Sequence, residues 1–482
     1  MKIQQISKVT RNQNSKSLDL ILNHPHNDYH IPFGADGFLD IWRNAPKHLK
    51  HKTPEGLLFV SRPDAEEIEK EIAYEIYRIG SNNFEFTTGG PGSGKSTKLV
   101  NDYTKNPGPV VAPSGVAAQR LAWDLMAVCT KFGQQAPEPS TIHSAFQIPV
   151  VGAPKWAQSN GRAKGKKRCD AVFVDEASMI DTQLFLTMLR RLKVGCKVFI
   201  YGDPDQLPPV GRGSPLLSLA GHVGRHVALK GNFRAQNQFL TDAISDLNEG
   251  KWPEDCQGFK TVRLNADFGA SCRKTAMMAY TNGAQIITPW RASAQCSGRV
   301  HASLSRKERK TGKVADFTSF VKGDEIVSCH SIHAASVTNG VRYIYEGKTC
   351  ANWKLKDVNN GSQFKVPISS IKKAAEFSMD QIKDPAEWET SSCFLFAGGL
   401  TIHKSQGSQY SSVVILIQDT KHLEFYSRAM TYVAASRAKH DVTVLISAAE
   451  DRVEEIKAAL LKKSSKYISR VPEHLKNLEG SK

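Results

Sequence analysis

The glycine-rich stretch Gly89-Gly90-Pro91-Gly92-Ser93-Gly94-Lys95-Ser96-Thr97 predicts a phosphate-binding loop. It fits the pattern GxxxxGK[ST] and lies between a strand-like run, Phe84–Thr88, and a segment with helical spacing. Backbone N–H groups of such a loop and of the following helix N-terminus bind phosphates. Lys95 would reach the β- and γ-phosphates, and the Ser96 hydroxyl would ligate magnesium. A glycine-rich turn without a ligand is the alternative, and the strand–loop–helix context disfavours it.

Two further apolar runs end in polar residues that a phosphate loop needs. AVFVDE, residues 171–176, ends in Asp175, which would hold the magnesium shell, and Glu176, which would orient and deprotonate a water. KVFIYGDPDQLPPVG, residues 197–211, brings Gln206, a neutral side chain able to sense the γ-phosphate. Acidic residues at strand ends are usually only solvated. The order and spacing of the three segments therefore carry the prediction of a nucleotide-hydrolysing site.

Short β-type runs alternate with helical segments along most of the chain, and a helix is predicted over Asp64–Ile79. Apolar runs alternating with helices indicate parallel sheets covered on both faces. Ala448–Leu461 has the spacing of an amphipathic helix, and a basic tail follows it. The runs begin at Val110, Ala171, Lys197, Ala284, Ser412 and Val442.

The 482-residue chain is strongly basic, with 64 Lys and Arg against 47 Asp and Glu, a net charge of +17 and a pI near 9.4. Such a balance favours a polyanionic partner, nucleic acid first; a basic surface kept for solubility is the alternative. The nine cysteines form no CxxC pair and no Cys/His cluster with zinc spacing. No apolar signal core or membrane-length run is present, so we expect a cytoplasmic protein with reduced thiols.

The motifs resemble those of superfamily 1 helicases, and they follow the family order from Gly89 to Leu445. TIHSAF, GDPDQLPPVG and TIHKSQG look most like the RecD and phage Dda branch. That resemblance implies 5′-to-3′ movement on single-stranded DNA, and with the compact size it favours a phage-type replication or recombination protein, in the host cytoplasm if phage-encoded. The segments similar to motifs I, Ia, Ib, II, III, IV, V and VI are GGPGSGKST, VVAPSGVAAQRL, TIHSAF, VFVDEAS, GDPDQLPPVG, LKGNFR, TIHKSQGSQYSSVVIL and YVAASRAKHDVTVL.

The resemblance implies an α/β fold of two RecA-like P-loop domains with parallel sheets, a small 1B insertion and an SH3-like 2B insertion. The predicted units are an unassigned N-terminal extension (1–60), domain 1A (61–225) with the 1B insertion at about 147–170, domain 2A (226–450) with the 2B insertion at about 300–393, and a C-terminal helix with a basic tail (451–482).

ATP and Mg²⁺ are the cofactors that the resemblance implies, in a site between the two domains. Arg234 and Arg437 would reach across from the second domain as cations for the γ-phosphate, where an isolated arginine would otherwise form a surface ion pair. The catalytic set is Lys95, Asp175, Glu176, Gln206, Arg234 and Arg437, with Ser96 and Asp175 on the metal and residues 89–97 and Gly407 on the nucleotide.

Single-stranded and forked DNA are the implied partners, with single-strand-binding or replisome proteins beside them, and a monomer is expected. Phe146 and Trp290 would stack on bases, or else pack in a core. Trp156, beside the basic run Arg162–Arg168 in the 1B stretch, would act as a strand-separating wedge. The residues expected to bind DNA phosphates, rather than to serve the fold alone, are Ser114, His143, Thr401 and His403.

The chain departs from the family at the adenine end of the site. No glutamine occurs between Arg62 and Glu85, where relatives carry one that recognises adenine, and Ser96 and Ser436 replace threonine. The alternatives are an RNA helicase of viral superfamily 1 type, a translocase that separates no strands, and a phosphate-loop kinase or binding module. Glu176 and Gln206 disfavour the last class.

Overall fold

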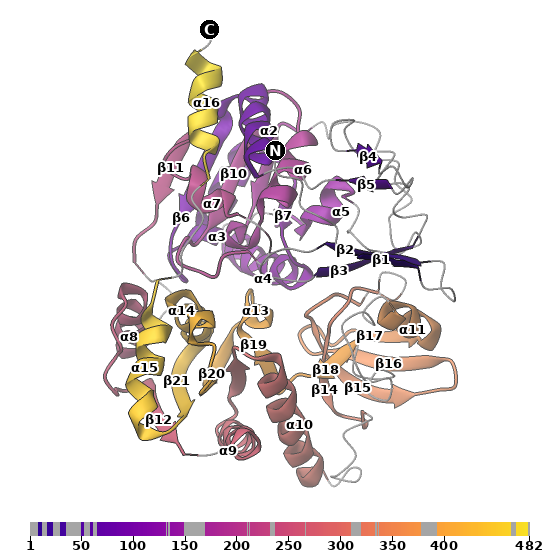
Figure 1. The fold of residues 1–482 in the computed structure, drawn as a ribbon, viewed down its shortest axis with the longest axis vertical. Helices are drawn as coiled ribbons and strands as arrows, with labels where there is room; N and C mark the ends of the chain where they lie inside the picture. The colour runs from indigo at the N-terminus through magenta and orange to yellow at the C-terminus, as the bar shows by residue number, and fades with distance from the viewer. Residues whose placement is uncertain are drawn as a thin grey trace.

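Two parallel sheets with helices on both faces form the body of the protein in a computed structural model, and an antiparallel module lies beside the second sheet (Figure 1). In the part of the chain that the structure describes, no helix is long and apolar enough to cross a bilayer. The described residues are 8–11, 17–22, 29–34, 50–52, 58–60, 65–131, 133, 135–148, 169–209, 211, 213–231, 237–265, 267–309, 320–332, 335, 337–376, 393–463 and 469–480.

The first sheet has six parallel strands, and the strand that feeds the glycine-rich loop, β6 (Phe84–Thr88), lies between β11 and β10. β11 pairs with β6 through Ala228, so this domain extends past the predicted boundary at residue 225. The other strands, in order across the sheet, are β11 (Arg225–Ala228), then, beyond β6, β10 (Lys197–Gly202), β9 (Ala171–Val174), β7 (Val110–Ala112) and β8 (Ser140–Thr141).

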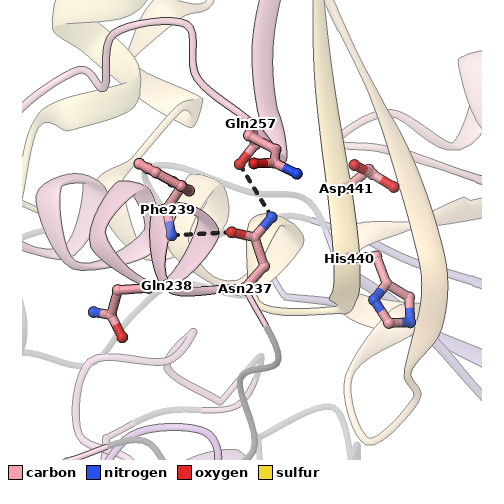
Figure 2. A pocket seen from close by; sticks show the side chains of 6 residues that line it. All are labelled: Asn237, Gln238, Phe239, Gln257, His440 and Asp441. Carbon is pink, nitrogen blue, oxygen red and sulfur yellow. Dashed lines mark hydrogen bonds between the residues drawn. The ribbon is translucent and has the colours of Figure 1, made fainter.

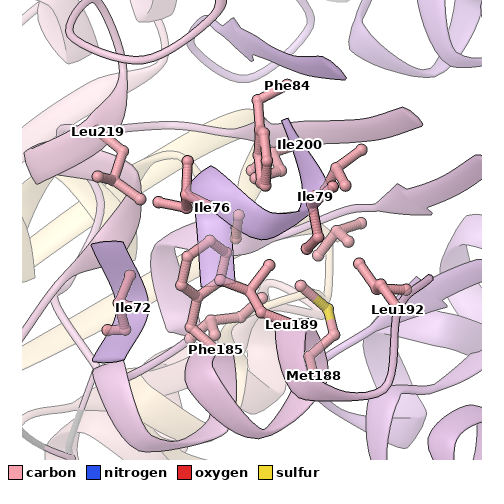
Figure 3. Packing of buried hydrophobic residues seen from close by; sticks show 14 of the residues in the cluster. Ile72, Ile76, Ile79, Phe84, Phe185, Met188, Leu189, Leu192, Ile200 and Leu219 are labelled. Atoms are coloured by element: carbon pink, nitrogen blue, oxygen red, sulfur yellow. The ribbon is translucent and has the colours of Figure 1, made fainter. Parts of the chain in front are cut away.

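Helices cover both faces of the first sheet because successive strand residues point to opposite sides. α2 (Ala65–Ile79) and α6 (Thr182–Arg190) pack on one face, where Figure 3 shows isoleucines of α2 against Phe185, Phe84 and Ile200. α3 (Lys95–Lys105) and α4 (Gly115–Lys131) cover the other face, against Phe173 and Tyr201. The strand Phe84–Thr88 and the helix predicted over Asp64–Ile79 are thereby confirmed.

The C-terminal segment, predicted as a basic tail, forms a helix that packs in the core of the first domain. After α15 (Val453–Leu461), which packs in the second domain, the chain forms α16 (Val471–Gly480) beside α2 of the first domain (Figure 1). Val471 and Leu475 are buried in the first domain's core, and the Arg470 N–H donates to Glu69 at 3.1 Å. α2 and α16, which lie far apart in the sequence, therefore pack in the same core.

The second sheet has five parallel strands, and its helices again lie on two faces. α8 (Gln238–Glu249), α14 (Arg428–Ala435) and α15 pack on one face, and α9 (Phe268–Thr281) and α10 (Arg291–Glu308) on the other. α10 extends to Glu308, past residue 300, near which the second insertion is predicted to begin. The strands, in order, are β12 (Phe259–Leu264), β21 (Ala438–Ser447), β20 (Tyr410–Gln418), β13 (Gln285–Thr288) and β19 (Gly399–Thr401).

The antiparallel module occupies most of the predicted second insertion and ends at Phe396 rather than at residue 393. Near the N-terminus lie a three-stranded antiparallel sheet of β1 (Lys8–Arg11), β2 (Ser17–Leu22) and β3 (Tyr29–Gly34) and a two-stranded one of β4 (Lys50–Lys52) and β5 (Leu58–Val60). The first predicted insertion, 147–170, falls almost wholly outside the described residues. The module's strands are β17 (Gln363–Pro367), β16 (Asn352–Asp357), β15 (Arg342–Lys348), β14 (Glu325–Ser328) and β18 (Phe394–Phe396).

A buried ion pair joins the second sheet to the module. Arg306, near the end of α10, and Asp324, just before β14, are both fully buried. The Arg306 guanidinium donates to both Asp324 oxygens at 2.6–3.2 Å, and Arg309 adds a bond of 2.8 Å. Breaking a buried pair from one side leaves an uncompensated charge, which costs far more than loss of a surface pair.

We predict that Arg306→Met lowers the free energy of unfolding by about 3–5 kcal/mol, because it strips Asp324 of its main partner. Arg190→Met, which removes a half-exposed pair with Glu71, should cost less than about 1 kcal/mol. Urea denaturation of both variants measures the difference, and the double variant Arg306→Met with Asp324→Leu should regain part of the loss. Equal midpoints for the two single variants would contradict this account.

Candidate nucleotide-binding site

The loop from Gly89 to Gly94 connects β6 to α3, and its conformation requires glycine. Gly92 and Gly94 have φ of 77° and 90°, a region that side chains with a Cβ rarely adopt. A Cβ on Gly89 would lie 2.5 Å from the Ser93 hydroxyl. The Lys95 ammonium donates to the carbonyls of Gly89 and Gly90 at 2.6 and 2.8 Å, so its charge lies over the loop.

A network of charges fixes α3 beneath the loop. Lys98, one turn after Lys95, donates to Glu85 of β6 and Asp102 of α3, each at 2.6 Å. The Tyr201 hydroxyl of β10 donates to the same Asp102 at 2.7 Å. The helix that carries Lys95 and Ser96 is therefore tied to two central strands.

Asp175 and Glu176 follow β9 and face the same loop. Burial and the neighbouring Glu176 carboxylate raise the pKa of Asp175 to about 7, while the charge of Lys95 opposes the shift. Glu176 has φ of 50°, a left-handed conformation that is uncommon outside glycine and that concentrates at functional sites. Asp175, the predicted metal ligand, thus interacts electrostatically with both Lys95 and Glu176, the predicted water-orienting residue.

The end of β10 reaches the second domain through a hydrogen bond. Asp203 is 1% exposed, and the Tyr432 hydroxyl of α14 donates to it at 2.9 Å. Burial raises the pKa of Asp203, against the charge of Lys95. A Cβ on Gly90 would lie 3.3 Å from that hydroxyl, so α14 lies directly against the glycine-rich loop.

Arg437 follows α14 and is buried at the same interface, with 2% of its surface exposed. It donates to the carbonyls of Val433 and Ser408 at 3.0 and 3.4 Å and to the Ser436 hydroxyl at 2.9 Å. Burial lowers the pKa of Arg437, and the negative charge of Glu176 opposes the shift. The structure thus brings Arg437 and Glu176 together, whereas Arg234 lies outside the described residues.

Several buried polar atoms around the loop have no hydrogen-bond partner among the described residues. Such atoms are rare in native interiors and point to a polar ligand or water. A nucleotide triphosphate with its hydrating water fits this set, since phosphates accept from hydroxyls and amides and water can donate to an amide oxygen. The atoms are Ser93 Oγ, Ser178 Oγ, Gln206 Oε1 and Gln406 Nε2.

The two Thr-Ile-His segments have the same local structure. Each follows an edge strand of a parallel sheet, β8 or β19, and opens a short helix, α5 (Ile142–Phe146) or α13 (Ile402–Ser405). The Thr141 and Thr401 hydroxyls cap these helices by accepting from the Ser144 and Lys404 amides. Burial lowers the pKa values of both histidines in these segments, which favours neutral imidazoles over cations. Ser114 similarly accepts from the Ala117 amide at 3.2 Å.

The aromatic residues expected to stack on bases divide into three cases. Phe146 is 3% exposed in the first domain's core, so the stacking role is wrong and the packing alternative is correct. Trp290 stacks on Phe425 at 4.5 Å, donates to the Tyr426 hydroxyl and lines a cavity of about 520 Å³. Trp156 lies outside the described residues.

A second cavity, of about 410 Å³, lies at the start of α8 (Figure 2). Asn237 caps α8 by accepting from the Phe239 amide and donates to the Gln257 carbonyl. Gln238 donates to Asp242. Because these polar groups already have partners, the cavity adds nothing to the site at the loop.

The site also includes two residues that the motifs did not single out, Asp203 and Tyr432. Asp203 and Tyr432 stand inside the quoted GDPDQ and YVAASRA segments, so a signal was present. The Arg120 guanidinium donates to the Gly407 carbonyl at 3.1 Å. Gly407, predicted to line the nucleotide, packs against α4, where its Cβ would lie 3.5 Å from the Ala117 backbone.

Comparisons with protein families agree with this geometry. Residues 75–266 match the AAA domain family, and residues 399–445 match the UvrD-like helicase C-terminal domain family. The chain is 28% identical over 392 residues to the ATP-dependent RecD2 DNA helicase of Deinococcus radiodurans, covering 77% of this chain and 48% of that protein. It therefore spans about half the length of that relative.

Other similar proteins are shorter matches or more distant. The RecD subunit of the RecBCD enzyme from Mycobacterium tuberculosis is 24% identical over 419 residues, 76% of this chain and 67% of that subunit. The ATP-dependent DNA helicase dda of Enterobacteria phage T4 is 27% identical over 190 residues, 37% of this chain and 40% of that helicase. A crystal structure of a Bacteroides Pif1 helicase with ADP-AlF3 and ssDNA aligns over 87% of this chain and 98% of that one, at 16% identity and a TM-score of 0.46.

We predict that Asp175→Asn stabilises the nucleotide-free protein at alkaline pH. The folded state holds the Asp175 proton up to about pH 7, whereas an unfolded carboxyl releases it near 3.8, so wild-type stability falls as pH rises through that window. Asparagine cannot ionise. The variant should melt at a higher temperature than wild type at about pH 8, and the gap should shrink at about pH 5.

Asp170→Asn is the matched control, because Asp170 is exposed and Lys193 holds its pKa below the ordinary value. This variant should gain nothing at alkaline pH. A gap for Asp175→Asn that is the same at both pH values would refute the ionisation argument.

Proposed function

We propose that the chain is an ATP-dependent DNA helicase of superfamily 1, in the RecD and Pif1 branch to whose members it is similar. It would move 5′ to 3′ on single-stranded DNA and separate the duplex ahead. One observation supports this most directly: α14 brings Tyr432 and Arg437 of the second domain against the glycine-rich loop and Glu176 of the first. A site divided between two domains can couple hydrolysis to their relative movement.

The residues at the loop have different roles in ATP hydrolysis. Phosphoryl transfer depends mainly on positioning and charge neutralisation, so Lys95 and Arg437 bind the phosphates from opposite sides. Glu176 accepts the proton of the attacking water, and Gln206, whose Oε1 has no partner among the described residues, orients that water. Ser96 and Asp175 would hold a magnesium ion, which would supply further neutralisation of phosphate charge. Arg234 is proposed as the second arginine.

The segments that follow β7, β8 and β19 supply the proposed DNA track. Ser114 and His143 in the first domain and Thr401 and His403 in the second lie at capped helix starts, where backbone amides and short side chains can bind phosphates without reading sequence. The net charge of +17 favours the same partner. Trp290, with one ring face on Phe425, remains the proposed stacking residue.

The two parallel-sheet domains take the roles of 1A and 2A in this proposal. The antiparallel module of β14–β18 takes that of 2B, and the stretch around residues 147–170, with Trp156, takes that of 1B. Replication or recombination on forked DNA is the proposed setting.

Unwinding of tailed duplexes tests the proposal. With ATP and magnesium, the chain should separate a duplex that carries a 5′ single-stranded tail and leave a 3′-tailed duplex paired. ATP hydrolysis should rise with poly(dT) more than with poly(U). Lys95→Ala, which removes the charge over the loop, should reduce both activities to background.

Each departure from this pattern rejects a specific part of the proposal. A 3′-tail requirement contradicts the polarity, stronger stimulation by poly(U) favours an RNA helicase, and stimulated hydrolysis without unwinding favours a translocase. Unchanged hydrolysis in Lys95→Ala would overturn the assignment of the site.

A further inference from the structure

α4 contacts three parts of the protein within its first two turns. It begins just after β7, the strand next to the one that delivers Asp175, and Ser114 caps its start. One side of these turns meets the second domain at Gly407, and the other meets the antiparallel module. A helix in this position contacts both units, so a movement of one unit relative to the other would change its contacts.

The contact with Gly407 is close and specific. Arg120 Nη1 donates to the Gly407 carbonyl at 3.1 Å, and Gly407 has φ of 77°. A Cβ at Gly407 would lie 3.5 Å from both N and Cα of Ala117, so backbone meets backbone here. Gly407 ends the segment that starts at Thr401, the proposed DNA contact of the second domain. Arg120 therefore holds the nucleotide-side end of that segment.

Arg120 also faces the hydrolysis site electrostatically. Its charge lowers the pKa of Asp175, against the larger effect of burial, and it likewise lowers the pKa of the buried Arg437. Arg120 pairs with Asp124 on its own helix at 3.7 Å. The guanidinium that bonds to Gly407 of the second domain thus also acts electrostatically on Asp175 of the first domain and on Arg437 of the second.

The module side of α4 is made by different residues. Gln119 donates to Asp357 of β16 at 3.3 Å, and Val116 packs against the module's core. A Cβ on Gly340 would lie 2.5 Å from Val116 Cγ2, so the Val116 side chain packs directly against the Gly340 backbone. Gln119 and Arg120 are adjacent in sequence but contact different units, so they can be tested separately.

We propose that Arg120 is a positioning residue that couples DNA binding along Thr401–Gly407 to the geometry of Asp175 and Glu176. It touches neither the nucleotide nor the DNA. When DNA holds Thr401–Gly407, Arg120 fixes that segment against α4, and Arg437 is brought to its place beside Glu176. The inference rests on the proposed DNA-stimulated ATPase and adds the residue through which the stimulation acts.

Steady-state ATP hydrolysis by the full chain, with and without oligothymidylate, tests this role. In Arg120→Gln, turnover with saturating DNA should fall at least about fivefold, while DNA-free turnover and the KM for ATP stay within about twofold. Arg120→Lys, which keeps the charge without the planar fork, should retain an intermediate stimulation. Gln119→Ala breaks only the module contact and should keep wild-type stimulation.

A binding measurement separates coupling from a structural effect. A non-hydrolysable ATP analogue should change the Kd of wild type for a labelled oligothymidylate. The ratio of the Kd with the analogue to the Kd without it should approach one in Arg120→Gln. A simple loss of packing would lower the melting temperature without removing the ratio. If Arg120→Gln does not fold, Arg120→Lys carries the same comparison.

Two results overturn the inference. The first is stimulation of Arg120→Gln by DNA as strong as that of wild type, with the same analogue-dependent ratio. The second is an equal fall in its DNA-free and DNA-stimulated turnover, which places Arg120 in the hydrolysis step itself. Failure of the proposed function gives a different result, because wild type would then show no stimulation by oligothymidylate. That result would reject the coupling role as well.

Discussion

The hydrogen bond from Tyr432 to Asp203 marks the constraint on which the site depends, the packing of α14 against the loops of the first sheet. A parallel sheet brings the ends of its strands to one edge, so β6, β9 and β10 deliver Lys95, Asp175 and Asp203 to neighbouring positions. That edge alone supplies a phosphate loop and carboxylates. Arg437 joins them only because α14 lies across the interface.

This packing concentrates unfavourable electrostatics at the interface. Burial raises the pKa values of Asp175 and Asp203 and lowers that of Arg437, so each charged form is less stable here than in water. A functional site often keeps such groups at a cost in stability. A phosphate chain with its counter-ion offers each of them a partner of opposite charge. The charged groups at the domain interface are therefore better compensated when a nucleotide is bound between the domains than when the domains pack together without one.

Central strands and motif residues could be predicted from the sequence, and edge strands could not. The central strands are buried over most of their length, and most of them contain an apolar run; they are β6, β7, β9, β10, β13, β20 and β21. At the sheet edges, β11 is mostly exposed and β12 is only partly buried, and β8 and β19 have only two and three residues. For the same reason the predicted end of the first domain, at residue 225, falls inside β11. Phe146 was ambiguous because an aromatic residue after a capped helix start suits both a core and a base.

Arg120 stands inside the quoted segment VVAPSGVAAQRL, but its role could not be predicted from that segment, for a different reason. Lys95 and Asp175 follow strands directly, so local order places them at the site. Arg120 lies in the second turn of α4, and its relevance depends on Gly407, which is 287 residues away in the chain. Only tertiary packing brings that carbonyl to the guanidinium. The same holds for α16, whose Val471 enters the core beside α2 because the chain returns to the first domain after completing the second. Contacts that join domains carry no local pattern, and in this protein they are the contacts through which one domain can act on the other.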